Sequence, residues 1–326
     1  MYDSFNRKIN YLRFSVTDRC DLRCQYCMPK KMKFSEKKDS LTLLEMKKIM
    51  EIFISLGFEK VKITGGEPLV RKDIIKFLEF LNSKLKQKFL KEISLTTNGN
   101  LLETHINSIH KNGVSRINIS LDSLINDKYS FITNGGNLSK VLRGIYSAKN
   151  KGIRIKINTV LLKNFNGDEI LNLVEWCSMN KFDISFIEIM PLGKIEMSRK
   201  DQYLPVSFAF NEIEKKYKLK KSSYTTSGPS KYFSNDNLNG KIGFISPISN
   251  NFCENCNRVR VTSNGLLYGC LGHENSINLK ELISSEKIDI LTKKIRETIY
   301  NKPKKHFFDI NKIDSELGRF MNLTGG

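Results

Sequence analysis

Long apolar stretches are missing from this 326-residue sequence. No run approaches the roughly 20 residues of a membrane-spanning helix, and residues 1–6 lack the apolar core of a signal peptide. With 40% hydrophobic residues the chain can still bury a large core, so we expect a soluble cytoplasmic protein with no membrane partner. Its seven cysteines would then lie in a reducing compartment, where thiols serve as metal ligands.

Acidic residues are few beside basic ones, since 34 Asp and Glu against 54 Lys and Arg give a net charge of +20. Such an excess can serve nucleic acid, an anionic membrane or a small anionic substrate. The basic residues are scattered, however, and only residues 301–306 form a dense block. Because there is no nucleic-acid-binding motif and no basic patch interleaved with aromatics, we expect no nucleic-acid partner and leave an anionic substrate open.

Three cysteines near the N-terminus, Cys20, Cys24 and Cys27, follow an apolar, strand-like run in the pattern C-x3-C-x2-C. Three thiolates on one loop suit a soft metal or an iron–sulfur cluster. A [4Fe–4S] cluster normally takes four cysteines, so three would leave one iron open to a small molecule. Zinc would need a fourth ligand, and the next seventy residues hold neither Cys nor His, while a disulfide would leave one thiol over. The spacing therefore favours a cluster with an open iron.

Strand and helix patterns alternate from residue 9 to about 191. This repeated β–α step predicts a parallel sheet with helices outside, as an α/β fold that is either doubly wound or a partial barrel. The unusual motifs all follow strands: the cysteine loop, Gly-Gly-Glu-Pro, Thr-Thr-Asn-Gly, Ser-Leu-Asp-Ser and Glu-Ile-Met-Pro. Because active sites of parallel barrels form at that rim, we predict a partial (βα)6 barrel of the TIM type. The predicted strands are 9–16, 60–64, 92–97, 116–121, 153–161 and 183–190, and the predicted helices are 43–56, 74–85, 101–111, 138–151 and 168–179.

The alternation stops near residue 192. Residues 222–229 are polar and predict a loop, whereas 241–247, 258–262 and 266–270 predict short strands with a turn at 263–265, and 279–299 predict a helix. We therefore predict an antiparallel β and helical C-terminal region that carries a cluster, and divide the chain into a barrel over 1–220 and a C-terminal region over 221–326.

A second cysteine group comprises Cys253, Cys256 and Cys270. Taken alone it fits zinc as well as a cluster, because His273 could complete a zinc site. Two cysteine triplets in one chain favour a second cluster with its own open iron. Arg258 and Arg260 would share one face of a strand, where guanidinium groups suit phosphate oxygens. The seventh cysteine, at position 177 on an apolar helix face, is expected in the core.

Tyr26 completes the pattern C-x3-C-x-aromatic-C, which resembles the signature loop of the radical S-adenosylmethionine (SAM) superfamily. Over essentially the whole chain the sequence also resembles the GTP 3′,8-cyclase family of molybdenum cofactor biosynthesis. The motifs that carry this resemblance are LRFSVTDRC, KITGGEPL, TTNG, INISLDS, KINTV, FIEIMP, FCxxCNRVRV and the terminal Gly-Gly.

The resemblance implies a role for each matched position. The two triplets would hold two [4Fe–4S] clusters, and the open iron of the second would bind guanine. Among the residues expected to bind GTP, Lys62 stands where the family usually has Arg. Lysine keeps the positive charge but lacks the planar guanidinium that binds two oxygens at once. Thr97 is an alternative to its neighbour Thr96 as a GTP contact. SAM would be held by Tyr26, Gly66, Ser120 and Met190, and GTP by Arg13, Lys62, Thr96, Lys156, Arg258, Val259 and Arg260.

The resemblance also implies the reaction. A 5′-deoxyadenosyl radical would take the hydrogen from ribose C3′, and attack on C8 would give (8S)-3′,8-cyclo-7,8-dihydroguanosine 5′-triphosphate for the next enzyme of the pathway. A flavodoxin- or ferredoxin-like donor would supply electrons, and Gly325 and Gly326 would enter the active site. The alternatives are another radical SAM enzyme with an auxiliary cluster, a two-cluster electron-transfer protein, and a sulfur-carrier or zinc scaffold.

Overall fold

The computed structural model describes residues 1–285, 288–311 and 317–325. These residues form one curved sheet of twelve strands, in the order β12-β11-β10-β1-β2-β3-β4-β5-β6-β9-β8-β7. The first six strands along the chain are parallel neighbours, as the sequence predicts. They are β1 (Tyr11–Ser15), β2 (Lys60–Thr64), β3 (Glu92–Thr97), β4 (Arg116–Ser120), β5 (Arg154–Leu161) and β6 (Asp183–Glu188).

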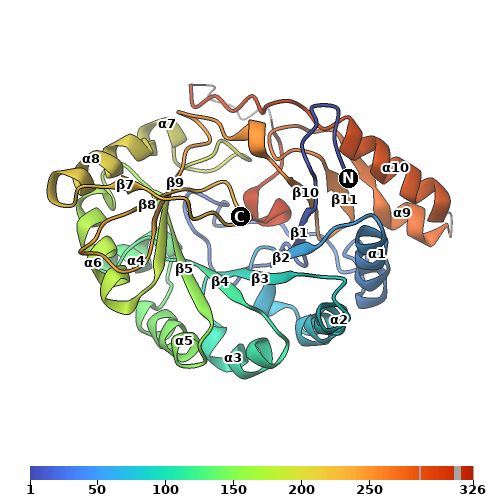
Figure 1. Ribbon diagram of the computed structural model, residues 1–326, viewed down its shortest axis with the longest axis horizontal. Helices are drawn as coiled ribbons and strands as arrows, with labels where there is room; N and C mark the ends of the chain where they lie inside the picture. Colours follow the sequence, from blue (N-terminus) through green and yellow to red (C-terminus); the bar gives the residue numbers. More distant parts are fainter. Residues whose placement is uncertain (286–287, 312–316, 326) are drawn as a thin grey trace.

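Helices cover the outer face of this sheet and leave its concave face as the interior of a barrel (Figure 1). Their apolar sides form one core with the sheet, in which Phe14 of β1 packs against Phe77 of α2 with ring centroids 5.6 Å apart. The helices of this layer are α1 (Leu43–Ser55), α2 (Ile74–Lys86), α3 (Leu102–Lys111), α5 (Leu138–Asn150), α6 (Ile170–Asn180) and α8 (Val206–Lys216). Sequence patterns predicted all of these except α8.

The C-terminal region extends the parallel sheet, which corrects part of the prediction. Strand β9 (Ile242–Ile245) pairs parallel with β6, and β10 (Arg258–Val261) pairs parallel with β1. The neighbouring strands from β10 to β9 are therefore all parallel, and the barrel is wider than six strands. Strands of four residues, such as IGFI and RVRV, carry no information on the direction of their neighbours, so the sequence could not supply this pairing.

The remaining elements complete the two edges of the sheet. The hairpin of β10 and β11 (Leu266–Tyr268) is antiparallel as predicted, and Gly265 in its turn has a φ of +84°. The predicted helix over 279–299 is instead two helices, α9 (Leu279–Ser284) and α10 (Ile288–Tyr300). The elements that the sequence analysis did not predict are α4 (Asn126–Thr133), α7 (Arg199–Gln202), α11 (Met321–Thr324), β7 (Lys220–Lys221), β8 (Lys231–Ser234), β12 (Ser276–Asn278) and the short 3-10 turns Pro68–Val70, Gly167–Glu169 and Cys253–Asn255.

Candidate active site

The first cysteine triplet lies at the carboxyl ends of the parallel strands, in the loop after β1. Cys20, Cys24 and Cys27 line one cavity. Tyr26 fixes their loop, because its hydroxyl donates to Asp122 at 2.7 Å. The same carboxylate accepts the Val160 N–H at 2.8 Å, so the loop is tied to the ends of both β4 and β5. Burial raises the pKa of Asp122 to about 6.

Gly65 and Gly66 let the backbone of the cysteine loop lie directly against the end of β2. A Cβ at Gly65 would lie within 3.0 Å of the Thr17 carbonyl oxygen, and one at Gly66 would collide with the carbonyl oxygen of Arg19. Both glycines also line the cavity of the first triplet. Glycine is therefore required here for the packing of two loops, in addition to any approach of a ligand.

Glu67 joins the ends of two neighbouring strands. Its buried carboxylate accepts the Thr97 hydroxyl at 2.8 Å, the Asn98 N–H at 2.7 Å and the Leu69 N–H at 3.0 Å. Burial raises its pKa to about 7. The Thr97 hydroxyl is thereby occupied and Thr97 lines only the first cavity, whereas Thr96 lines both cavities, which favours Thr96 as the residue that faces a substrate.

The environment of the first triplet fits an iron–sulfur cluster. Burial raises the pKa of Cys24, and that of Cys27 to about 12, so these thiols would lose their protons only to a bound metal. N–H donors already point at the sulfurs: Leu22 N lies 3.4 Å from Cys20 Sγ, and the backbone N–H of Asn322 donates to Cys27. Such N–H···S bonds are the usual surroundings of cluster ligands.

The second cysteine triplet lies at the opposite end of the barrel. Cys253 and Cys256 precede β10, and the hairpin returns Cys270 to the same level. Because β10 is parallel to β1, this level is the amino-terminal end of the parallel strands. All three cysteines line a second cavity. Burial acts to raise the pKa of Cys256, but nearby Arg258 and Lys302 outweigh it and lower that pKa to about 7.

His273 does not face the second triplet as a zinc ligand would. Its Nε2 is hydrogen-bonded to the Lys305 carbonyl at 2.9 Å, and its ring lies against Phe307. No three His, Cys, Asp or Glu side chains of the described residues are arranged to hold a single metal ion. The cysteine sulfurs of a four-iron cluster each bind a different iron and do not converge on one point, so this triplet fits a cluster better than zinc.

The second cavity is strongly basic. Of the described residues that line it, none is Asp or Glu. Burial and then Arg13 lower the pKa of Lys62, while burial and then Arg116 lower that of Lys156 to about 7. Clustered buried cations of this kind are stabilised by a bound polyanion. The Lys and Arg side chains of the lining are Arg13, Lys62, Arg116, Lys156, Arg258, Arg260 and Lys302.

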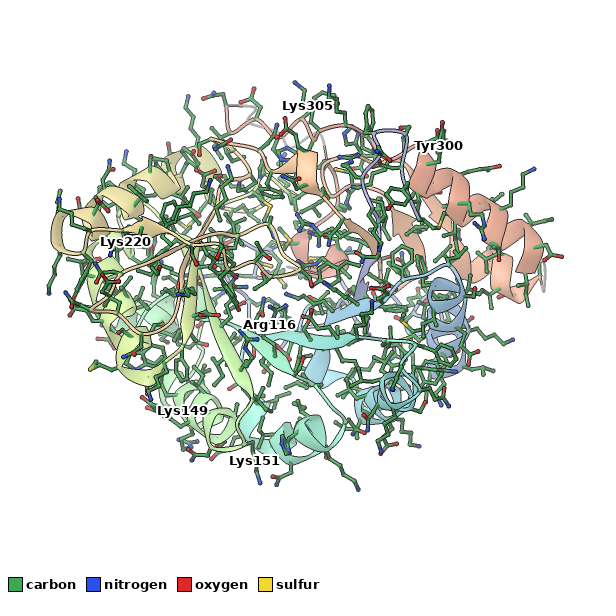
Figure 2. All side chains as sticks on the ribbon, viewed as in Figure 1. Arg116, Lys149, Lys151, Lys220, Tyr300 and Lys305 are labelled. Atoms are coloured by element: carbon green, nitrogen blue, oxygen red, sulfur yellow. The ribbon has the colours of Figure 1, made fainter. Side chains whose placement is uncertain are left out.

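The sheet register places these cations beside one another. Arg13 of β1 lies between Arg260 of β10 and Lys62 of β2, and Lys156 of β5 pairs with Asn118 of β4. Figure 2 shows Arg116 in the interior of the barrel, whereas Lys149, Lys151 and Lys220 lie at its periphery. Val259 is the exception among the residues expected at GTP, because its side chain packs in the core on the opposite face of β10 and is 1% exposed.

The two cavities are continuous inside the barrel. Ser120 lines the first cavity and Met190 lines both. Ligands bound at the two cysteine triplets could therefore meet near the middle of the interior. The residues shared by both linings are Thr96, Asn158, Ile187, Met190 and Met321.

The C-terminal segment enters this interior, and Figure 1 shows it at the centre of the barrel. Asn322 Nδ2 donates to the Asp18 carbonyl at 2.8 Å, and Arg260 donates to the Gly325 carbonyl at 2.7 Å. Gly325 has a φ of +76°, and a Cβ there would collide with Thr64. Gly326 lies outside the described residues.

Sequence reasoning missed several residues of the lining, including Arg116, Asn118, Asn158 and Lys302. A signal for the first three was present, because each strand alternates apolar residues with polar ones, as in Arg-Ile-Asn-Ile-Ser. In a barrel the polar set faces the interior. Lys302 falls in the basic block of residues 301–306, yet it is only 2% exposed. Cys177, in contrast, lies in the core as expected.

Comparison with known proteins agrees with this architecture. A partial barrel with three cysteines after its first strand is characteristic of the radical SAM superfamily, whose family model matches residues 14–177. A second family model, described as Molybdenum Cofactor Synthesis C, matches residues 182–308. The crystal structure of Streptococcus suis SuiB bound to S-adenosylmethionine has a TM-score of 0.61 and 17% identity, over 89% of this chain and 68% of that one, which shows a shared fold.

Similarity to curated relatives extends over the full chain. The proteins named GTP 3′,8-cyclase from Brucella ovis and Brucella canis are each 46% identical to it over 100% of this chain and 96% of the relative. The chain therefore belongs to the GTP 3′,8-cyclase family of radical SAM enzymes, which use an iron–sulfur cluster and S-adenosylmethionine. No helix in the described part of the chain is long and apolar enough to span a membrane.

Proposed function

We propose that the protein converts GTP to (8S)-3′,8-cyclo-7,8-dihydroguanosine 5′-triphosphate, the first step of molybdenum cofactor biosynthesis, in the cytoplasm. The observation that carries the proposal is the continuous interior between two cysteine triplets, basic at one end and free of lining carboxylates there among the described residues. An electron carrier would need no such cavity. A nucleoside triphosphate, with its polyanion and its flat base, suits it.

The basic residues would bind the triphosphate. Arg258 and Arg260 face the cavity from one strand, and Lys62 and Lys156 face it from two others. Because these cations are fixed on strands, they would hold the ribose at a defined height in the barrel. Cys253, Cys256 and Cys270 would hold a second [4Fe–4S] cluster whose open iron takes the guanine base.

The opposite end would bind the cofactor. Cys20, Cys24 and Cys27 would hold the first [4Fe–4S] cluster, beside Tyr26, Gly66, Ser120 and Met190 as SAM contacts. When bound and reduced, the first cluster and SAM would supply the 5′-deoxyadenosyl radical that abstracts the C3′ hydrogen of GTP. Thr96 and Met190 line both cavities, so the reacting carbon would lie beside them. Bound in the barrel interior, the reacting groups would be shielded from water and stray hydrogen donors.

Two partners follow from this reaction. A reduced flavodoxin- or ferredoxin-like protein would supply the electron for the first cluster. The next enzyme of the pathway would take up the released product.

The test is anaerobic turnover of reconstituted protein with SAM, dithionite and GTP deuterated at C3′. We expect about eight irons per chain, deuterium in 5′-deoxyadenosine and the cyclised product. ATP serves as the control nucleotide and should give neither. Cleavage of SAM without deuterium transfer from GTP would favour the alternative, a radical SAM enzyme acting on another substrate.

A further inference from the structure

Lys302 is a buried cation that neither the motifs nor the resemblance singled out. It lies beyond α10 in the basic block of residues 301–306, but only 2% of it is exposed. Its ammonium donates to the Gly269 carbonyl at 2.6 Å, one residue before Cys270. It also lies close enough to Cys256 for its charge to lower the pKa of that thiol, and it lines the cavity of the second triplet. Lys302 thus lies beside both cysteine-bearing segments, the one before β10 and the one after β11.

No carboxylate of the described residues forms an ion pair with this ammonium. Its hydrogen-bond acceptor is the Gly269 carbonyl, and Cys256 lies nearby. A buried charge without a counter-charge is costly, so a native protein normally supplies one. Here Cys256 of the second triplet is a nearby group that can carry negative charge.

The backbone around Lys302 is fixed to the same triplet by a second buried cation, Arg7. Its guanidinium pairs with Asp3 at 2.6 Å and donates to the Cys253 carbonyl at 2.8 Å. The same group donates to the carbonyls of Pro303 at 2.8 Å, Lys304 at 3.0 Å and Lys302 at 3.4 Å. Because one planar group holds both segments, the ammonium of Lys302 keeps its place relative to the cysteines.

We propose that Lys302 is the electrostatic partner of the second cluster and raises its reduction potential, an inference that rests on the proposed second [4Fe–4S] site. A fixed positive charge beside a cluster stabilises its more negative, reduced form. A cluster tuned in this way accepts an electron more readily than the same cysteine triplet would without the lysine.

The experiment is a redox titration of anaerobically reconstituted protein without GTP, followed by electron paramagnetic resonance. The variants are Lys302→Met, which removes the charge and the donor, and Lys302→Gln, which removes the charge and keeps a donor for Gly269. The control is Lys305→Met, since Lys305 is exposed and Figure 2 shows it at the periphery. Water and salt screen a charge placed there.

We expect the potential of the second cluster to become more negative in both Lys302 variants, and less so in Lys302→Gln. The first cluster, in the same molecule, should keep its potential, and Lys305→Met should change neither. An unchanged second potential with weakened GTP binding would overturn the proposal, because Lys302 would then be a phosphate ligand.

Loss of the second cluster from both Lys302 variants, with the first retained, would also overturn it, since Lys302 would then serve assembly. If the wild-type protein gives the signal of only one cluster, the second cluster is absent and the proposed tuning role of Lys302 is ruled out with it. Failure of the proposed function and failure of this inference therefore give different results.

Discussion

The two ends of the barrel differ in the charge of their buried side chains. At the carboxyl end, the buried carboxylates of Glu67, Asp122 and Glu188 accept N–H and O–H donors of the surrounding loops, and Asp122 holds the loop of the first triplet through Tyr26. At the amino end, cations line the cavity without carboxylates among the described lining residues. The loops of the first end are therefore held by carboxylates of the protein itself, whereas the lining of the second end carries an excess of positive charge that suits an anionic substrate.

The largest effect on activity should come from removing a cysteine ligand at one end of the barrel while leaving the other end intact. Cys24→Ala should abolish SAM cleavage, because the first cluster loses a ligand. Cys256→Ser should keep the first cluster and SAM cleavage but lose about half the iron, roughly four of eight atoms. Iron analysis measures the cluster content of each variant, and 5′-deoxyadenosine formation measures its SAM cleavage. Loss of SAM cleavage in both variants would mean that the two ends assemble together.

The next largest effect should fall on substrate binding at the amino end. Arg258→Ala and Arg260→Ala should each weaken GTP binding by about 1.5–3 kcal/mol, since each removes a buried charged donor. Arg258→Ala is the cleaner variant, because Arg260 also binds the Gly325 carbonyl. The control is Arg143→Ala, whose exposed pair with Glu103 lies between outer helices. Equal GTP affinity in wild type and the double variant would remove these residues from the substrate site.

The sequence was most informative at the carboxyl end. Glycines, cysteines and polar residues follow strands there in continuous motifs, so the local sequence sufficed to predict that Cys20, Cys24, Cys27 and Gly66 meet at one rim, and they line one cavity. The amino end is assembled from residues far apart in the chain, such as Arg116 and Lys302, and from the pairing of β10 with β1. Long-range pairing leaves no local pattern in a single sequence.

A smaller effect on turnover should follow from adding a side chain to the C-terminal segment, which lies between the two ends of the barrel. Gly325→Ala places a Cβ against Thr64 at a φ of +76°, so the tail must move. We expect SAM cleavage to remain while deuterium transfer from C3′ and product formation fall by about 100-fold, as misplacement by 1 Å can do. Gly318→Ala is the matched control, because a Cβ there meets nothing within 4 Å. Full activity of Gly325→Ala would show that the tail does not position the substrate.

The smallest effect concerns pH. The pKa of Lys156 is lowered to about 7 by burial and by Arg116, with Asp183 opposing. The Lys156 ammonium, which we propose binds the triphosphate, is therefore present below about pH 7 and lost above it, and bound phosphate would favour the charged form. GTP affinity should fall as pH rises from 7 to 9, by at most about tenfold per unit for this group.

Lys156→Met should bind GTP more weakly at pH 7 and show a flatter profile, with a residual slope from Lys62, whose pKa is also lowered. Exposed Lys151→Met should keep the wild-type slope. Calorimetric titration across this range measures both. If the GTP affinity of Lys156→Met falls with pH as steeply as that of the wild type, the pH dependence belongs to other groups.

The pairing of β1 with β10 also sets the order in which the protein can be made. Strand β1 leaves the ribosome early, yet the strand that covers its outer edge spans Arg258–Val261. Until those residues are synthesised, β1 presents an unpaired edge able to join other chains. Chains that stop before β10 should therefore aggregate during synthesis, and slow elongation ahead of residue 258 should lower the yield of soluble protein.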